Sequence, residues 1–433
     1  MNYIGRIIDH FSRMNGLEGA GIDYPVMLCI YLGIFLFCFI ANVMLYISDH
    51  GNRVVWLADQ HKVIKSKFNY MAMLACTFTG VYLVGSFPSE LQNTYGTWNA
   101  DLFYTLGQTT IMITAGIYSL ATFKKKSSVI LNSLSIIVGL STSIPMAATT
   151  ILSPLNIESN LIRLSAIVAT IISFVLLAAL SVKYDLLVKY SRINIYLFML
   201  TTIALFTTIN TFGDGNVDTS KILPFQGMIN GEPWKELLNN PYWWYFEATV
   251  VSWSIFCGRF IAYCSNGYSV KDIIKYGTIS LIILTIIWHL VSAATGYTLS
   301  FSRGWVIYTL TALTMLAFAV TSLDSASKTL LNDITRISEN KHIKYKPSFS
   351  LNLKCCMGGI GLINIIILYT GSSKLFTILF CLIFVPFLVK AILYNIWFAI
   401  GKIDFKKSGT ITKEEYMAIC GDEPDESDFR RII

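Results

Sequence analysis

The feature that most constrains this chain is a series of apolar runs, each about 20 residues long, that recur along its whole length. A helix of about 20 apolar residues crosses the roughly 30 Å hydrocarbon core of a bilayer. Backbone N–H groups in lipid must be paired within their own segment, so we expect about eleven spanning α-helices in one all-α polytopic membrane protein. The runs lie near residues 25–47, 70–88, 101–123, 130–152, 162–181, 190–212, 241–263, 274–298, 305–330, 354–371 and 374–399.

Composition and motif content argue against a soluble enzyme. Hydrophobic residues make up 54% of the chain and charged residues only 14%. The nine cysteines lack metal-ligand spacing, which favours buried structural thiols. The sequence contains no Walker A segment, nucleophile elbow or HExxH motif, so neither enzymatic chemistry nor a resident cofactor has candidate residues.

The distribution of basic residues predicts how the helices are oriented. Lysine and arginine concentrate in the first, third, fifth, seventh and ninth connections, and the other connections carry far fewer. The positive-inside rule makes the basic connections cytoplasmic, with the first helix starting outside a bacterial cytoplasmic membrane and the C-terminal tail inside. The net charge of +7 therefore reflects topology and lipid headgroups, and we expect no nucleic-acid partner.

The two ends of the chain differ from the apolar runs. Residues 1–24 carry apolar side chains at helical spacing with charges between them, which predicts an amphipathic segment on the outer surface. Residues 400–433 begin with a few basic residues and end in a polar, acidic stretch, which predicts a loosely ordered cytoplasmic tail.

Three motifs resemble those of the betaine/carnitine/choline transporter family. They are FAVTSLDSAS at Phe318–Ser327, SWSIFCGRFIAYCSNGYS at Ser252–Ser269 and the KYSRINIYLFML segment around Ser191–Asn194. The resemblance extends from about residue 25 to 400. It implies a leucine-transporter-like fold of two inverted five-helix repeats, at 70–212 and 241–399, joined by an outer loop with an amphipathic helix at 213–240. Family members usually have two helices before the repeats, whereas this chain has one peripheral helix, at 25–47.

The resemblance implies a secondary transporter. Two inverted halves suit alternating access, because one bundle of helices can rock about a central solute site. The leading hypothesis is transport of a small polar solute through the lipid bilayer. The alternative is a non-transporting binding or scaffold subunit that keeps the fold. The family's trimers imply a homotrimer, and a scaffold role implies association with another membrane protein.

The aromatic box that holds quaternary ammonium substrates in the family is mostly missing from this chain. On one helix the expected tryptophans fall on Glu247, Thr249 and Val250, and on the other they fall on Thr110 and Ala115. Each lost ring removes about 0.5–2 kcal/mol of cation–π attraction, so betaine and choline are poor candidate solutes. The expected site keeps the rings of Trp253, Phe256 and Tyr118 together with backbone groups of Cys76, Thr77 and Phe78.

Glu247 follows five consecutive aromatic residues, Tyr242–Phe246, inside an apolar run. A carboxylate at the site would favour a primary amine, a guanidinium or the ammonium group of an amino acid. We therefore expect an amine-bearing or zwitterionic solute. The alternative is that Glu247, about 9 Å from the start of its helix, reaches interfacial water, with the aromatic residues forming a belt at the membrane surface.

Arg259 lies deep in the same apolar run, where an unpaired charge costs on the order of 2.5–3.5 kcal/mol. The runs at 241 and 305 cross the membrane in the same direction, so we expect Arg259 and Asp324 to pair at similar depth. Lys328, one turn from Asp324, is the competitor or third member. On opposing halves these residues would form an inner gate. Alternatively, Arg259 only extends to the cytoplasmic headgroups.

Thr321 and Ser322 raise the question of a coupling ion. In the family's sodium-coupled members the threonine and serine of this motif hold Na⁺, and a carbonyl at Phe318 with carbonyls near Leu74 and Thr77 would complete the shell. The family's glycine-rich break in the facing helix becomes CTFTG here, which gives the backbone less freedom to unwind. The alternative for both hydroxyls is ordinary bonding to the preceding helical turn.

Overall fold

The computed structural model describes residues 24–56, 64, 66–79, 97–123, 125–179, 184–208, 241–295, 304–339, 354–355, 357–363, 383–403 and 410–420. The predicted surface segment before residue 24 and the outer loop at 213–240 lie outside these residues. The long helices are α2 (Tyr24–Ile47), α3 (Lys67–Thr79), α5 (Thr97–Thr122), α6 (Lys126–Leu152), α7 (Asn160–Ala179), α8 (Tyr184–Thr207), α12 (Pro241–Cys264), α13 (Val270–Thr295), α14 (Trp305–Glu339) and α17 (Val385–Ala399). Each overlaps a predicted span.

Length and composition support membrane crossing. Among the described residues, four helical stretches are long and apolar enough to span a bilayer: Ile30–Ile47, Lys126–Leu155, Asn160–Ala179 and Trp305–Asp333. The outer faces of these helices carry exposed large apolar side chains, such as Phe37 of α2 and Leu176 of α7. Such faces are stable against lipid and costly against water.

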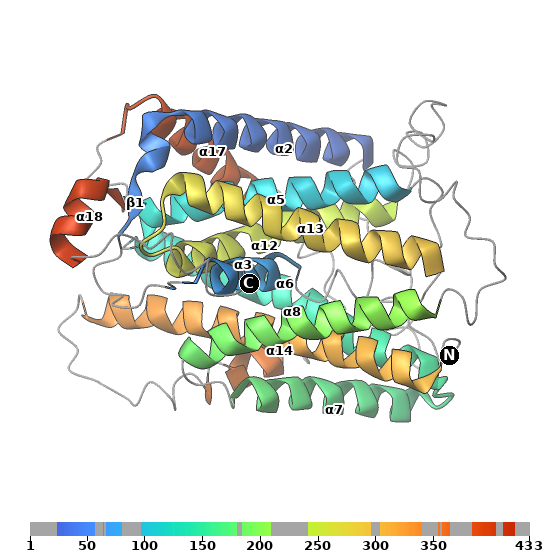
Figure 1. The fold of residues 1–433 in the computed structure, drawn as a ribbon. Coiled ribbons are helices and arrows are strands. Elements are labelled where there is room, and N and C mark those ends of the chain that lie inside the picture. The colour runs from blue at the N-terminus through green and yellow to red at the C-terminus, as the bar shows by residue number, and fades with distance from the viewer. Residues whose placement is uncertain are drawn as a thin grey trace.

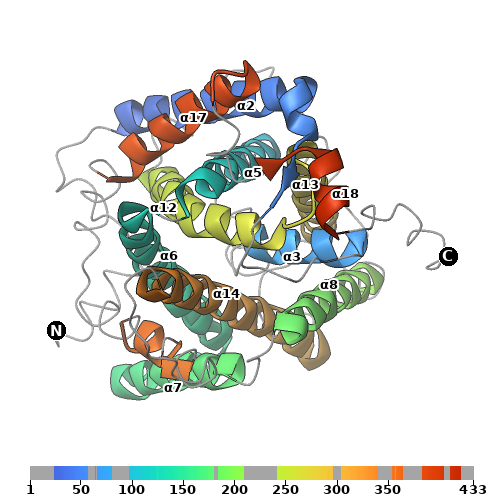
Figure 2. The same ribbon diagram turned by 90° about the vertical axis from the view of Figure 1, so that its left-hand side faces the viewer.

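Figures 1 and 2 show how the helices are grouped. Helices α3, α5, α12 and α13 pack together and are called here the central helices. On one side of them lie α2 and α17, and on the other lie α6, α7, α8 and α14, called here the lower helices. The first two helices of one predicted repeat, α3 and α5, therefore pack against the first two of the other, α12 and α13, and the third helices, α6 and α14, also pack together.

The helices α5 and α12 form the most extensive helix pair in the described structure. They cross at Gly116 and Gly258, where a Cβ on Gly258 would lie 2.6 Å from the backbone nitrogen of Gly116. Glycine on both helices allows the two backbones to approach closely, as small residues do between helices in membranes. This crossing fixes which faces of α5 and α12 turn toward the lower helices.

Hydrogen bonds inside the apolar region attach α2 and α17 to the central helices. The Asn42 side chain of α2 donates to the carbonyl of Thr110 (3.0 Å) and accepts from the hydroxyl of Thr114 (3.1 Å). The Asn395 amide of α17 donates to the Thr114 carbonyl (3.1 Å). Because water is absent from the hydrocarbon core, such amides need protein partners, and α5 supplies them.

Part of the C-terminal tail is ordered, which differs from the loose tail that its composition predicts. Strand β2 (Thr410–Ile411) pairs antiparallel with β1 (Val54–Val55), beside the short 3₁₀ helix η2 (Asp49–Asn52). Helix α18 (Lys413–Cys420) follows β2, and a second 3₁₀ helix, η3 (Ser153–Leu155), ends α6 at the other end of the bundle.

Local hydrogen bonds explain the order in the tail. Thr412 and Glu415 exchange side chain to backbone hydrogen bonds of 2.8 and 3.1 Å, which cap the first turn of α18. The Arg53 guanidinium donates to the hydroxyl of Thr410 (3.3 Å). Partial burial lowers the pKa of Arg53, and the charge of Glu415 opposes that shift. The tail therefore docks on the connection that follows α2.

Candidate functional site

The last described turn of α3, which reaches Thr79, lies inside the helix bundle and is hydrogen-bonded to other helices. The Gln108 amide of α5 donates to the carbonyl of Phe78 (2.6 Å), and the thiol of Cys257 on α12 donates to the carbonyl of Thr77 (3.5 Å). The Cys76 thiol donates to the carbonyl of Ser191 on α8 (3.6 Å). The three predicted backbone positions of α3 thus lie between α5, α8 and α12.

Trp253 and Phe256 lie on α12, with ring centroids 6.0 Å apart, and both are buried. Gly139 of α6 lies beneath the indole, and a Cβ there would come within 2.6 Å of Cδ1 of Trp253. The indole N–H of Trp253 is a buried donor with no hydrogen-bond partner among the described residues. A buried donor of this kind is costly unless another molecule satisfies it.

A serine from α6 bonds to the backbone of α12 at the same level. The Ser135 hydroxyl donates to the carbonyl of Ser252 and accepts from the backbone N–H of Phe256 (3.2 Å). These two backbone groups are four residues apart, on successive turns of α12. The Ser135 hydroxyl therefore bridges two turns of one helix. It couples α6 to the segment that carries Trp253.

Tyr118 does not lie with the other predicted site residues. Its ring contacts Phe387 and Tyr394 of α17, at 5.3 Å in each case. Gly116, two residues earlier, faces α12, and two residues turn an α-helix by about 200°. Tyr118 is therefore directed away from α12, and the prediction that it shares a pocket with Trp253 is wrong.

Thr321 lies where α14 meets α8 and α3. The Asn194 amide of α8 donates to the Thr321 hydroxyl oxygen and to the carbonyl of Ala317, both at 3.0 Å. The Thr321 hydroxyl in turn donates to the carbonyls of Ala317 and Phe318, both at 3.0 Å. Cys76 of α3 lies 4.0 Å from the same amide. Hydroxyl and carbonyl oxygens from two turns of α14 thus gather beside α3.

Ser322 is buried next to Thr321, and its carbonyl accepts from the hydroxyl of Ser325 (2.9 Å). The carbonyl of Phe318 accepts a hydrogen bond from the Thr321 hydroxyl. The hydroxyl of Thr321 therefore bonds to the preceding turn, as one of the two interpretations expects. Of the oxygens named in the other interpretation, the carbonyl of Phe318 lies on the same helix, 3.0 Å from the Thr321 hydroxyl, and those of Leu74 and Thr77 lie on α3.

Arg259 is fully buried and makes an ion pair with Asp333 of α14, with Nε 2.5 Å from Oδ2. Its other guanidinium nitrogens donate to the hydroxyl of Ser128 (2.8 Å) and to the carbonyl of Phe123 (2.9 Å). The Phe123 ring lies beneath the guanidinium carbon, 4.6 Å from the ring centroid. All five N–H donors of an arginine point in fixed directions, so these contacts fix its position.

Asp333 is also fully buried, and its carboxylate accepts two more hydrogen bonds. The Tyr263 hydroxyl donates to Oδ1 (2.9 Å) and the Asn132 amide donates to Oδ2 (2.7 Å). The inner network, defined here as Phe123, Ser128, Asn132, Arg259, Tyr263 and Asp333, comes from the end of α5 and from α6, α12 and α14. It therefore joins central helices to lower helices.

The expected pair between Arg259 and Asp324 is wrong. Asp324 accepts instead from Lys328 of its own helix at 2.7 Å, and both side chains are buried. The predicted span ends near residue 330, whereas α14 continues to Glu339. Asp333 lies nine residues beyond Asp324, about 13 Å along the helix, and that places it at the level of Arg259.

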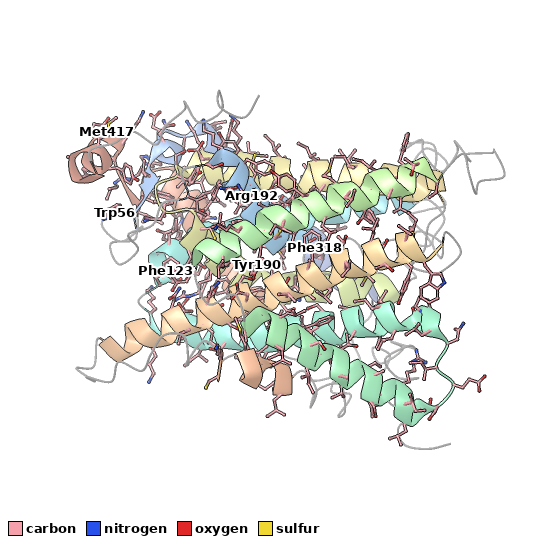
Figure 3. The ribbon with its side chains drawn as sticks, turned by 60° about the horizontal axis from the view of Figure 1, so that its bottom comes forward. Trp56, Phe123, Tyr190, Arg192, Phe318 and Met417 are labelled. Atoms are coloured by element: carbon pink, nitrogen blue, oxygen red, sulfur yellow. The ribbon has the colours of Figure 1, made fainter. Side chains whose placement is uncertain are left out.

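Figure 3 shows the two clusters at different levels of the bundle. Phe123, of the inner network, lies toward the end that carries Trp56 and Met417, which the positive-inside rule predicts to be cytoplasmic. Phe318 lies nearer the middle. Glu247 belongs to the first turns of α12, but the placement of its side chain lies outside the described structure.

Comparison with known proteins supports the fold. No model of a protein family matches the chain, and no curated protein matches its sequence. The fold is similar to a substrate-bound outward-open Na⁺-coupled sialic acid symporter, with a TM-score of 0.50, 11% identity and 86% coverage of each chain. Two Eremococcus coleocola manganese transporter structures, a mutant and a complex with an aromatic bis-isothiourea compound, have TM-scores of 0.48 and 0.41. Their identities are 13% and 12%, and they cover 80% and 82% of this chain and 79% and 80% of their own.

The similarity to the sialic acid symporter confirms the expected fold class. The chain is an all-α polytopic membrane protein with a leucine-transporter-like fold. At 11% identity the match establishes the fold alone. The betaine/carnitine/choline transporter family stays a prediction that rests on the motifs.

Several residues of the site escape the sequence analysis. Asp333 follows the predicted end of its span, although a buried arginine demands a carboxylate nearby. Asn132 and Ser135 are polar positions within the apolar run at 130–152. Polar side chains in membrane helices face protein partners, so these positions could have been identified from the sequence. Asn194 lies in one of the quoted motifs but has no role assigned from it.

We expect removal of one member of the Arg259–Asp333 pair to destabilise the protein more than removal of both. Arg259→Met or Asp333→Leu leaves an uncompensated buried charge, which costs about 3–5 kcal/mol, whereas an apolar pair of similar volume is often neutral. The melting temperature and the monodisperse fraction in detergent measure this effect. A double variant as unstable as either single variant would contradict it.

Proposed function

We propose that this chain is a secondary active transporter that moves a small polar solute, amine-bearing or zwitterionic, across the cytoplasmic membrane by alternating access. The fold supports a transporter, since such folds place a solute between two helix groups that move relative to each other. The observation that carries the proposal is the inner network, which joins those two groups at one end through a fully buried ion pair.

The solute site is centred on Trp253, between α12, α6 and the end of α3. The indole nitrogen can only donate, so an oxygen of the solute would satisfy it. A carboxylate would be the strongest acceptor. Glu247, earlier on α12, would supply the opposite charge for an amine. Both ends of a zwitterion would then have partners on the same helix, without the aromatic box of the family.

The inner network is the closed form of the cytoplasmic gate. Opening the protein toward the cytoplasm requires the central helices to separate from α6 and α14. That movement breaks the contacts of Arg259 with Asp333 and Ser128, which connect the two groups. The separated charges would enter water as the pathway opens, so their desolvation cost is recovered. Lys328 and Asp324 belong to one helix and separate no groups.

Sodium coupling is the second proposal. The hydroxyl of Thr321 and the carbonyl of Phe318 would be oxygen ligands, and Cys76 on α3 lies beside them, 4.0 Å from the Asn194 amide that donates to Thr321. These residues fit a hard cation. Ser322 and the carbonyl of Thr77 would be further ligands. The Asn194 amide now donates to Thr321, so ion binding would require its oxygen to turn toward the site.

A non-transporting subunit with the same fold is the alternative. The loss of the aromatic box and of the glycine-rich break motivates it. Such a subunit would keep the inner network closed, and its solute site would bind nothing. Both differences are measurable, and partner association or a homotrimer would be detected by the mass of the purified protein.

We expect zwitterionic amino acids to raise the melting temperature of the purified protein more than glycine betaine or choline do, in a screen with and without Na⁺. Trp253→Phe keeps an aromatic ring but removes the N–H donor, and it should abolish this shift. Trp288→Phe is the matched control, because Trp288 is another buried indole without a partner among the described residues. Equal loss in both variants would contradict the site assignment.

We expect the Arg259→Met, Asp333→Leu double variant in proteoliposomes to expose Cys257 to a membrane-impermeant thiol reagent from the cytoplasmic side. Cys257 is fully buried on α12, and it becomes accessible only if the inner end opens. Peptide mapping by mass spectrometry measures the labelling. The control variant is Asp324→Asn, Lys328→Met. Labelling in the control alone would show that the gate is the other ion pair.

We expect Thr321→Ala to remove any Na⁺-dependent rise in melting temperature. Without Na⁺, the free energy of unfolding of this variant should stay within about 1 kcal/mol of the wild-type value, because that is the typical contribution of one hydrogen bond. Thr314→Ala is the control, because Thr314 is a buried hydroxyl two turns earlier on α14. A Na⁺ response that survives in Thr321→Ala would remove this site from the proposal.

A further inference from the structure

A groove with a volume of about 320 Å³ lies between α2, α5 and α13, away from the solute site. Its volume falls within the roughly 300–1,000 Å³ of ligand sites. Phe39, Val43 and Tyr46 form its outer rim on α2 and are between 41% and 44% exposed, so the groove opens toward the region that lipid occupies. Most of its wall is apolar, with Leu106 from α5 and Ile274 and Ile279 from α13.

The amide of Asn42 in the wall of the groove is already satisfied inside the protein. The Asn42 amide is bonded to the Thr110 carbonyl, and its oxygen accepts from Thr114. Thr110 itself is buried. The inner part of the groove therefore offers an apolar surface to a ligand, which suits a hydrocarbon chain rather than a polar solute.

One end of the groove is basic. Lys275 lies on the second turn of α13, is exposed, and contacts the ring of Tyr276 at 5.5 Å. Among the described residues it forms no ion pair. The aliphatic part of Lys271, one turn earlier, lies against Gly51. The carboxylate between these lysines, Asp272, is engaged by Ser269 at the start of the helix.

The basic end lies at the headgroup level of the leaflet that the positive-inside rule predicts to be cytoplasmic. Tyr46 is one residue from the end of α2, and Lys275 is about 7 Å from the start of α13. Phe39 lies about 12 Å from the same end of α2. A phosphate would then lie at Lys275, at the basic outer end of the groove. An acyl chain would follow Val43 and Phe39, deeper in the membrane, where the wall is apolar.

We propose that this groove binds one anionic phospholipid of the cytoplasmic leaflet, with its headgroup at Lys275 and an acyl chain between α2 and α13. Basic pockets between membrane helices on the cytoplasmic side recognise anionic headgroups in this way. The lipid would join the peripheral helix α2 to a helix of the second predicted repeat. The proposal depends on the membrane fold and the groove, and it holds whether or not the chain transports a solute.

Native mass spectrometry of the full chain, with dioleoylphosphatidylglycerol or dioleoylphosphatidylcholine added, tests the proposal. The wild-type protein should bind phosphatidylglycerol at least about fivefold more tightly, and Lys275→Ala should lose that preference, since one lysine near the headgroups accounts for about this factor. Val43→Trp, which fills the groove without a change in charge, should weaken the binding of both lipids.

Two variants of α6 serve as matched controls. Lys126→Ala removes another exposed lysine at the predicted cytoplasmic end, and Ile130→Trp enlarges another exposed side chain. Both should bind the two lipids as the wild type does, and size-exclusion chromatography checks the folding of all four variants. Equal binding of the two lipids by the wild type would overturn the proposal. So would equal losses in Lys275→Ala and Lys126→Ala, or unchanged binding in Val43→Trp.

Discussion

The ion pair between Arg259 and Asp333 is the interaction on which the arrangement of the helices depends. Two fully buried charges in an apolar interior are tolerable only with good geometry and with their remaining donors and acceptors satisfied. Arg259 uses Ser128 and the carbonyl of Phe123, and Asp333 uses Tyr263 and Asn132. The network comes from three stretches of the chain, 123–132, 259–263 and residue 333, so the pair forms only when the central and lower helices meet.

The need to pair buried polar groups also explains the structure around the proposed solute site. Each polar group that the apolar region contains must be paired within the protein, because the hydrocarbon core holds no water. The carbonyls of Phe78 and Thr77 on α3 accept from Gln108 and Cys257, and the Ser135 hydroxyl bonds to two backbone groups of α12. The indole N–H of Trp253 is among the buried polar groups that lack a partner within the described residues, and it is the one that lies beside the end of α3.

The helices α2 and α17 are attached by hydrogen bonds of neutral side chains rather than by buried charges. Asn42 and Asn395 attach α2 and α17 to α5 through hydrogen bonds within the membrane. At the predicted cytoplasmic end, a two-stranded sheet joins the tail to the connection after α2. The central helices are thus held on one side by α2, which precedes the repeats, and by α17, the last helix of the second predicted repeat, while the inner network holds them to the lower helices. A protein that moves by rocking of two groups needs contacts of both kinds.

The sequence alone determined the solvent, the helical class and the approximate spans, because apolar length and the need to pair backbone groups in lipid are local properties. It also located Arg259, Trp253 and Thr321 on their helices. It did not identify Asp333 as the partner of Arg259, and it did not predict that Tyr118 contacts α17. Those outcomes depend on how far α14 extends and on how α5 and α12 cross at Gly116 and Gly258. Such distances between helices are set by tertiary packing, since residues far apart in the chain meet only there.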